Sequence, residues 1–151
     1  MELDKAINEA VKELVKKYCG KIVAVGIFGS YARREFTEKS DIDILVIVEN
    51  WERSLERRFK IYDILFKHIK RDITLIDIDL EDAEALLKGK LKFSSTMLNI
   101  LYDCIVLYDP KGILRKLIEE TKMLVERLKL RRYKIGKSYG WVIQSEARSL
   151  R

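Results

Sequence analysis

Apolar residues along this chain recur either at helical spacing or in short continuous runs, and the two patterns alternate. Runs rich in β-branched residues predict buried strands over residues 21–28, 41–48, 72–78 and 104–108. Apolar positions three and four residues apart predict helices over residues 3–18, 51–69, 80–87, 93–103 and 112–130, with a short helix at 31–33. The alternation favours the α/β (α+β) class, with helices covering a small mixed β-sheet.

The most strand-like segment and the helix after it define the expected core. Residues 41–48 (DIDILVIV) are apolar on both faces beyond the first three positions, which is typical of a central strand. In the next helix, four aromatic residues lie on the expected inner face: Trp51, Phe59, Tyr62 and Phe66. We therefore expect these four side chains to be buried.

The composition fits one folded domain that needs no disulfide or structural metal. The chain has 151 residues, 48% hydrophobic and 36% charged, and a domain of this length buries roughly two thirds of its unfolded surface. No apolar run approaches the roughly 20 residues of a membrane helix. The N-terminus lacks a signal-peptide pattern. We expect a cytoplasmic protein without a membrane span.

Positive charge is concentrated toward the C-terminus. Residues 111–151 contain 12 Lys+Arg and 4 Asp+Glu, a net charge of +8, whereas residues 1–110 contain 18 and 20, a net charge of −2. A run without an acid spans residues 127–137, with Arg127, Lys129, Arg131, Arg132, Lys134 and Lys137. This run suits nucleic acid, ATP phosphates or an acidic partner surface, and a solvated helix end explains it equally well.

The same change in composition suggests how the domain is organised. We expect a core over residues 1–110, and a C-terminal helix with a basic extension over 111–151 that packs on the same domain. Four apolar residues of the extension are unsuited to a free tail: Tyr139, Trp141, Val142 and Ile143. They are expected to dock on the domain or on another subunit, which would give a homo-oligomer.

Two carboxylates at the start of the central strand are the first candidates for chemistry. Strand residues alternate between faces, so Asp41 and Asp43 project from one side while Ile42 and Ile44 enter the core on the other. Two converging carboxylates repel each other unless a cation lies between them. Mg²⁺ prefers oxygen ligands and completes its shell with water or substrate phosphates. The pair therefore predicts a magnesium site.

A Gly29-Ser30 turn precedes Asp41, with ten residues between Ser30 and Asp41. A strand that enters such a turn and then a helix leaves backbone N–H groups free to bind a polyphosphate. Ser30 has an alternative structural role as a helix N-cap. Together the turn and the two carboxylates predict a site for a metal-bound nucleoside triphosphate.

A third carboxylate is expected on an adjoining strand, where it would hold metal or accept the proton of an attacking hydroxyl. Asp72 is the leading candidate because it opens a strand, as Asp41 does. Its structural alternative is an ion pair with Arg71 or Lys70. Asp77 and Asp79 are weaker candidates, since they would lie at the far end of the same strand.

Residues 26–33 (GIFGSYAR) and 40–46 (SDIDILV) resemble the signature of the DNA polymerase β-like nucleotidyltransferase superfamily, in its minimal nucleotidyltransferase (MNT) branch. The resemblance implies a nucleotidyltransferase fold and transfer of a nucleoside monophosphate, such as AMP from ATP, to an acceptor hydroxyl, with two Mg²⁺ ions. The implied roles are catalysis and metal binding for Asp41, Asp43 and Asp72, and phosphate binding for Gly29 and Ser30. Arg33 is a further candidate for phosphate binding, and a solvated surface charge explains it equally well.

One position departs from the family pattern. The family often has Gly after the Ala-Arg pair, where this chain has Arg34. A non-glycine residue is less free to adopt a positive φ, so we expect a different loop path there. Arg34 itself is interpreted as a solvated surface charge.

Small members of the branch often act beside a helical HEPN-type partner, and in some pairs the transferase is an antitoxin that adenylylates a tyrosine of the toxin. The resemblance therefore implies a HEPN-type toxin as acceptor. Two alternatives stay open from the residues alone. One is a nucleotide-binding or partner-neutralising subunit without turnover, and the other is an enzyme that modifies nucleic-acid ends through residues 127–137.

Overall fold

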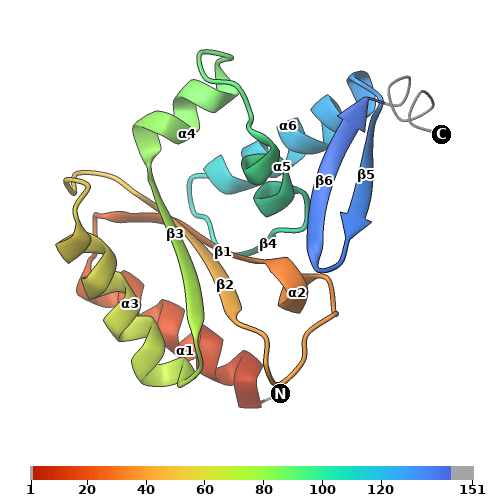
Figure 1. The fold of residues 1–151 in the computed structure, drawn as a ribbon. Coiled ribbons are helices and arrows are strands. Elements are labelled where there is room, and N and C mark those ends of the chain that lie inside the picture. Colours follow the sequence, from red (N-terminus) through yellow and green to blue (C-terminus); the bar gives the residue numbers. More distant parts are fainter. Residues whose placement is uncertain (1, 144–151) are drawn as a thin grey trace.

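The computed structural model describes residues 2–143 (Figure 1). Its helices are α1 (Glu2–Lys17), α2 (Gly29–Ala32), α3 (Leu55–Ile69), α4 (Leu80–Leu87), α5 (Ser95–Tyr102) and α6 (Ile113–Arg127). Its strands are β1 (Ile22–Phe28), β2 (Ile42–Val48), β3 (Ile73–Asp79), β4 (Ile105–Tyr108), β5 (Leu130–Ile135) and β6 (Ser138–Ile143). The predicted helices and strands all occur, with shifted ends, and the last two strands are additional.

A four-stranded sheet with the order β3-β2-β1-β4 forms the centre of the fold. β2 pairs in parallel with β3, while β1 is antiparallel to both β2 and β4. The sheet is therefore mixed, as predicted. β2 lies in its interior, which agrees with the apolar run that the sequence places on both of its faces.

Helices cover both faces of the sheet, and each face has its own hydrophobic core. On one face, α1 and α3 pack against alternate strand residues such as Ile42, Ile44 and Val46. On the other, α4, α5 and α6 pack against Leu45 and Ile47 (Figure 1). This arrangement confirms the α+β class and the alternation expected for β2. None of the helices within residues 2–143 is both long and apolar enough to cross a membrane.

The prediction that all four aromatic residues after β2 are buried was wrong for two of them. Phe59 is 66% exposed and Phe66 is 43% exposed. α3 turns a different stripe toward the sheet, containing Ile61, Ile64 and Leu65, and this leaves Phe59 and Phe66 to one side. A helix presents only one face to a sheet, and here aliphatic side chains occupy it.

The helix predicted to start after β2 also begins later than expected, at Leu55. Ser54 is its N-cap and accepts a hydrogen bond from the backbone N–H of Arg57 at 3.0 Å. Trp51 therefore precedes the helix. Its indole ring packs on the ring of Tyr18, with 4.5 Å between centroids, and is partly buried against the core, so the prediction of full burial on a helix face was not met.

The C-terminal extension folds as a β-hairpin. α6 ends at Arg127 rather than at residue 130, and β5 and β6 pair antiparallel in a separate two-stranded sheet. The side chain of Trp141 donates to Asn99 of α5 at 2.9 Å, so this residue contacts the domain, whereas Ile143 is 43% exposed. Residues 144–151 of the extension lie outside the described residues, and the division at residue 110 stays a prediction.

Candidate active site

The two predicted carboxylates lie at the N-terminal end of β2. Asp41 is exposed just before the strand, and Asp43 is half-buried within it. Burial raises the pKa of the Asp43 carboxyl above its usual value, and the nearby charge of Asp41 acts in the same direction. The Thr74 hydroxyl and the Arg33 guanidinium oppose this rise. Asp43 thus carries a partly uncompensated negative charge, which is the condition that favours cation binding.

The Gly29-Ser30 turn faces this carboxylate pair. Gly29 has a φ of 73°, and a Cβ built on it would overlap the Asp43 carboxylate, so only glycine fits the position. The N-cap of α2 is Phe28, whose side chain caps no backbone N–H. The alternative role of Ser30 as an N-cap is therefore wrong, since Ser30 lies inside the helix and lines the same cleft as Asp43.

The third carboxylate is not assembled with the pair. Asp72 is exposed just before β3, and its carbonyl accepts a hydrogen bond from the backbone of Ile42 at 2.9 Å. Among residues 2–143, no three acidic, histidine or cysteine side chains lie together in a way that could hold a metal ion. The role of Asp72 therefore stays a prediction.

Thr74 lies beside the pair instead. The parallel register of β2 and β3 sets Thr74 next to Asp43, and the Thr74 hydroxyl donates to the Asp41 carboxylate at 3.1 Å. Thr74 was not among the site residues predicted from the sequence. A signal was available, because β2 and β3 open with similar patterns, DIDI and DITL, and aligning the patterns matches Thr74 to Asp43.

The weaker candidates Asp77 and Asp79 serve a structural purpose at the other end of β3. The fully buried guanidinium of Arg57 donates to Asp77 at 2.9 Å and to Asp79 at 2.6 Å. Arg58 donates to Asp77 from the surface at 3.0 Å. These bonds tie α3 to β3 and hold both carboxylates away from the cleft.

Arg33 and Arg34 follow α2 and differ in their surroundings. Arg33 donates to Glu35 at 2.9 Å and to Asp103 at 3.2 Å, so two of its guanidinium nitrogens already have partners. A phosphate contact from Arg33 stays a prediction. Arg34 is exposed and adopts a φ of 63°, so the expectation that this residue would avoid a positive φ was wrong. The loop keeps the left-handed turn without glycine.

A cleft of about 430 Å³ joins these residues. It is lined by Ser30, Arg33, Glu35, Thr37, Lys39, Ser40, Asp41, Asp43, Lys134, Lys137 and Tyr139. The last three belong to the C-terminal hairpin. ATP phosphates were one of the ligands predicted for the basic run that contains Lys134 and Lys137, whereas Tyr139 was not predicted at the site. The cleft therefore brings the phosphate-binding turn, the carboxylate pair and the basic extension together.

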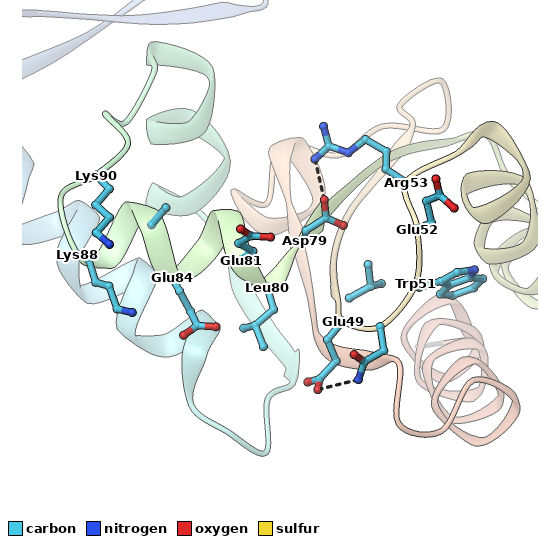
Figure 2. Close-up of a pocket in the computed structure, with 13 residues that line it drawn as sticks. Glu49, Trp51, Glu52, Arg53, Asp79, Leu80, Glu81, Glu84, Lys88 and Lys90 are labelled. Atoms are coloured by element: carbon cyan, nitrogen blue, oxygen red, sulfur yellow. Dashed lines mark hydrogen bonds and ion pairs between the residues drawn. The ribbon is translucent and has the colours of Figure 1, made fainter.

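A larger hollow of about 710 Å³ lies at the opposite end of β2 and β3 (Figure 2). Its wall carries carboxylates of Glu49, Glu81 and Glu84, and Arg53 points toward Asp79, with 3.5 Å between them. This hollow contains neither the Gly-Ser turn nor the Asp41–Asp43 carboxylate pair. We therefore place the candidate active site in the smaller cleft.

The family described as "Polymerase beta, Nucleotidyltransferase" matches residues 9–100, which include the turn and the carboxylate pair. The chain belongs to this nucleotidyltransferase family. The nucleotidyltransferase is 28% identical over 129 residues to the Methanocaldococcus jannaschii protein named "Putative protein adenylyltransferase MJ1305", covering 84% of this chain and 86% of that protein. A second protein of that organism, MJ0141, carries the same functional name. It is 34% identical over 79 residues, which cover 52% of this chain and 79% of that protein.

Solved structures share the fold of this nucleotidyltransferase. One is a toxin–antitoxin crystal structure with AMP-PNP, with a TM-score of 0.54, 19% identity and coverage of 81% of this chain and 89% of that chain. Another contains a tri-AMPylated Shewanella oneidensis HEPN toxin in complex with an MNT antitoxin. Its TM-score is 0.52, with 18% identity and coverage of 85% of this chain and 90% of that chain. At these identities the likeness concerns the fold alone.

Proposed function

We propose that this nucleotidyltransferase moves AMP from ATP to a hydroxyl group of a partner protein. The observation that carries the proposal is the meeting of Asp41 and Asp43 with the Gly29-Ser30 turn in one cleft. The names of the M. jannaschii relatives support a protein acceptor. The AMP-PNP in one structure of the same fold supports an adenine nucleotide.

The donor set of the cleft fits Mg²⁺. Asp41 and Asp43 supply carboxylate oxygens, and the half-buried Asp43 has a raised pKa that a bound cation would lower. Both carboxylates would hold the ions, which neutralise charge on the phosphates when bound. The Thr74 hydroxyl, 3.1 Å from the Asp41 carboxylate, positions that carboxylate for this role.

The turn would hold the phosphate chain. Because residue 29 has no side chain, backbone N–H groups at the start of α2 can approach a phosphate beside Asp43. The acceptor hydroxyl oxygen then attacks the α-phosphorus and gives up its proton to a carboxylate of the cleft or to water, while the bond to the bridging oxygen breaks and pyrophosphate leaves. The main contribution of the fold to this step is that it holds the Gly29-Ser30 turn and the two carboxylates at a fixed separation.

A HEPN-type toxin is the acceptor that we favour. The S. oneidensis complex pairs an MNT antitoxin with an AMPylated HEPN toxin on the same fold. Transfer of AMP would add a bulky negative group to the partner and provide a route to neutralise it.

The test is transfer of label from α-labelled ATP to a candidate HEPN-type partner in the presence of Mg²⁺. We expect label on a partner tyrosine, and loss of transfer by at least about 100-fold in Asp41→Asn and Asp43→Asn. Asp63→Asn, which changes an exposed carboxylate on α3, is the matched control. Equal transfer in all four proteins, or no label with the unaltered chain, would contradict the proposal.

A second function, nucleotide binding without turnover, has one observation in its favour. Thr74 stands beside Asp43 where a third carboxylate was expected. In that case the chain would bind AMP-PNP and neutralise its partner equally well with or without Asp43→Asn, and no pyrophosphate would be released. The same assay therefore separates the two functions.

A further inference from the structure

The C-terminal hairpin reaches the candidate active site, although it lies far from it in sequence. Its turn lies close to α2 (Figure 1), and Lys134, Lys137 and Tyr139 line the cleft that contains Asp41 and Asp43. In the hairpin, Lys134 pairs with Tyr139 across the two strands. The hairpin therefore forms one wall of the cleft.

Arg132 anchors this wall to α5. Its guanidinium donates to the two carboxylate oxygens of Asp103 at 2.9 and 2.7 Å, and it lies over the rings of Tyr139 and Trp141 at 4.3 and 5.3 Å. Asn99 adds a bond from its amide to the carbonyl of Tyr139 at 2.9 Å. A paired and stacked arginine of this kind fixes the position of a strand more firmly than an exposed ion pair does.

A second set of bonds fixes the hairpin relative to the Gly-Ser turn. Arg33, at the end of α2, shares Asp103 with the hairpin arginine and lies 4.5 Å from the ring of Tyr139. The Tyr139 hydroxyl bonds to both carboxylate oxygens of Glu35 at 2.9 and 3.0 Å. The wall is thus held from α2 and from α5, so its side chains have a defined position relative to the carboxylates.

Two cations of the wall are free to bind a ligand. Lys137 has no ion-pair partner within residues 2–143, and Lys134 has only a distant one, with 3.9 Å to Glu35. Strand alternation sets Lys134 on the same face as Arg132, whereas Arg131 lies on the opposite face. The basic residues of the extension therefore have different positions. Arg132 anchors the hairpin, and Arg131 lies on the opposite face. Lys134 and Lys137 line the cleft.

We propose that Lys134 and Lys137 bind the β- and γ-phosphates of the nucleotide across the cleft from Asp41 and Asp43. This inference rests on the proposed function and specifies how the same site selects a triphosphate. A triphosphate carries most of its charge beyond the α-phosphate, and the lysines supply positive charge in the cleft where it is needed. An acidic acceptor segment is the competing ligand, and the experiment separates the two.

The experiment measures equilibrium binding of AMP-PNP and of AMP to the full chain with Mg²⁺, without any acceptor. In Lys134→Ala and Lys137→Ala, we expect AMP-PNP affinity to fall about 5- to 10-fold each, and more in the double variant, with AMP affinity unchanged. Lys134→Arg restores AMP-PNP binding, because it keeps the charge. Arg131→Ala, on the same strand but the opposite face, is the matched control.

The outcomes of this measurement are distinct. Equal AMP-PNP affinity in the lysine variants and in Arg131→Ala would overturn the inference while leaving the proposed function intact. So would a defect seen only with an acidic acceptor present. If the unaltered chain binds no AMP-PNP, the proposed function itself fails. Circular dichroism of each variant checks the fold, which exposed lysines are not expected to affect.

Discussion

Gly29 lies so close to Asp43 that any side chain at residue 29 would overlap the Asp43 carboxylate. We expect Gly29→Ala to lower AMP transfer by about 100-fold. The added methyl group would push the Asp43 carboxylate aside, and even a small displacement would misalign it with the bound nucleotide. Gly89→Ala is the matched control, since Gly89 has a similar φ of 75° but no atom near its Cβ position. Similar transfer in both variants would show that the contact has no functional importance.

Thr74 supports the carboxylate pair through its hydroxyl. Thr74→Val removes that bond, so we expect Mn²⁺ affinity, measured by titration with paramagnetic detection, to fall about 3- to 10-fold. Thr74→Asp supplies a third carboxylate beside Asp43 and is expected to tighten Mn²⁺ binding. Thr96→Val, at an exposed position of α5 outside the cleft lining, serves as control. Tighter binding in Thr74→Val would refute the supporting role.

Asp43 should destabilise the fold when no cation is bound. Its pKa is raised in the folded protein, so the folded state binds the proton more tightly than the unfolded state, and stability falls as pH rises through the folded pKa. We expect Asp43→Asn to have a higher Tm than the unaltered chain at pH 7 in EDTA. The difference should disappear below the ordinary aspartate pKa of 3.8. A lower Tm for Asp43→Asn at pH 7 would contradict this account.

Arg34 holds a left-handed turn without glycine. A non-glycine residue in this conformation costs about 1 kcal/mol, so Arg34→Gly is expected to raise the free energy of unfolding by that amount. Denaturant titration measures it. Because Arg34 is exposed and lies outside the cleft lining, AMP transfer should not change. Loss of transfer would instead assign Arg34 a contact with a substrate.

Arg57 ties α3 to the C-terminal end of β3 through two ion pairs. It is fully buried and bonds to Asp77 and Asp79, so Arg57→Met leaves Asp77 buried with only a surface arginine as partner. We expect a loss of about 3–5 kcal/mol in the free energy of unfolding. Replacing both residues, in Arg57→Met with Asp77→Leu, should recover part of it. Additive losses in the double variant would show that the two side chains do not interact energetically.

The sequence by itself determined the elements that depend on local pattern. β2 could be predicted because its apolar run must be covered on both faces, and Asp41 and Asp43 because alternation along a strand puts them on one side. The Gly29-Ser30 turn carried a recognisable motif for the same local reason. The cleft in the structure contains all of these residues except the buried glycine, which faces Asp43 directly.

Only the tertiary structure decided which distant residues meet. The register between β2 and β3 put Thr74, and not Asp72, beside Asp43, because it pairs residue 74 with Asp43 whereas Asp72 precedes Ile73, the first paired residue of β3. Packing of α3 buried its aliphatic stripe and left Phe59 exposed. Long-range contacts of Arg132 brought Lys134 to the cleft. Local periodicity describes a single element, whereas these placements depend on how elements pack against each other.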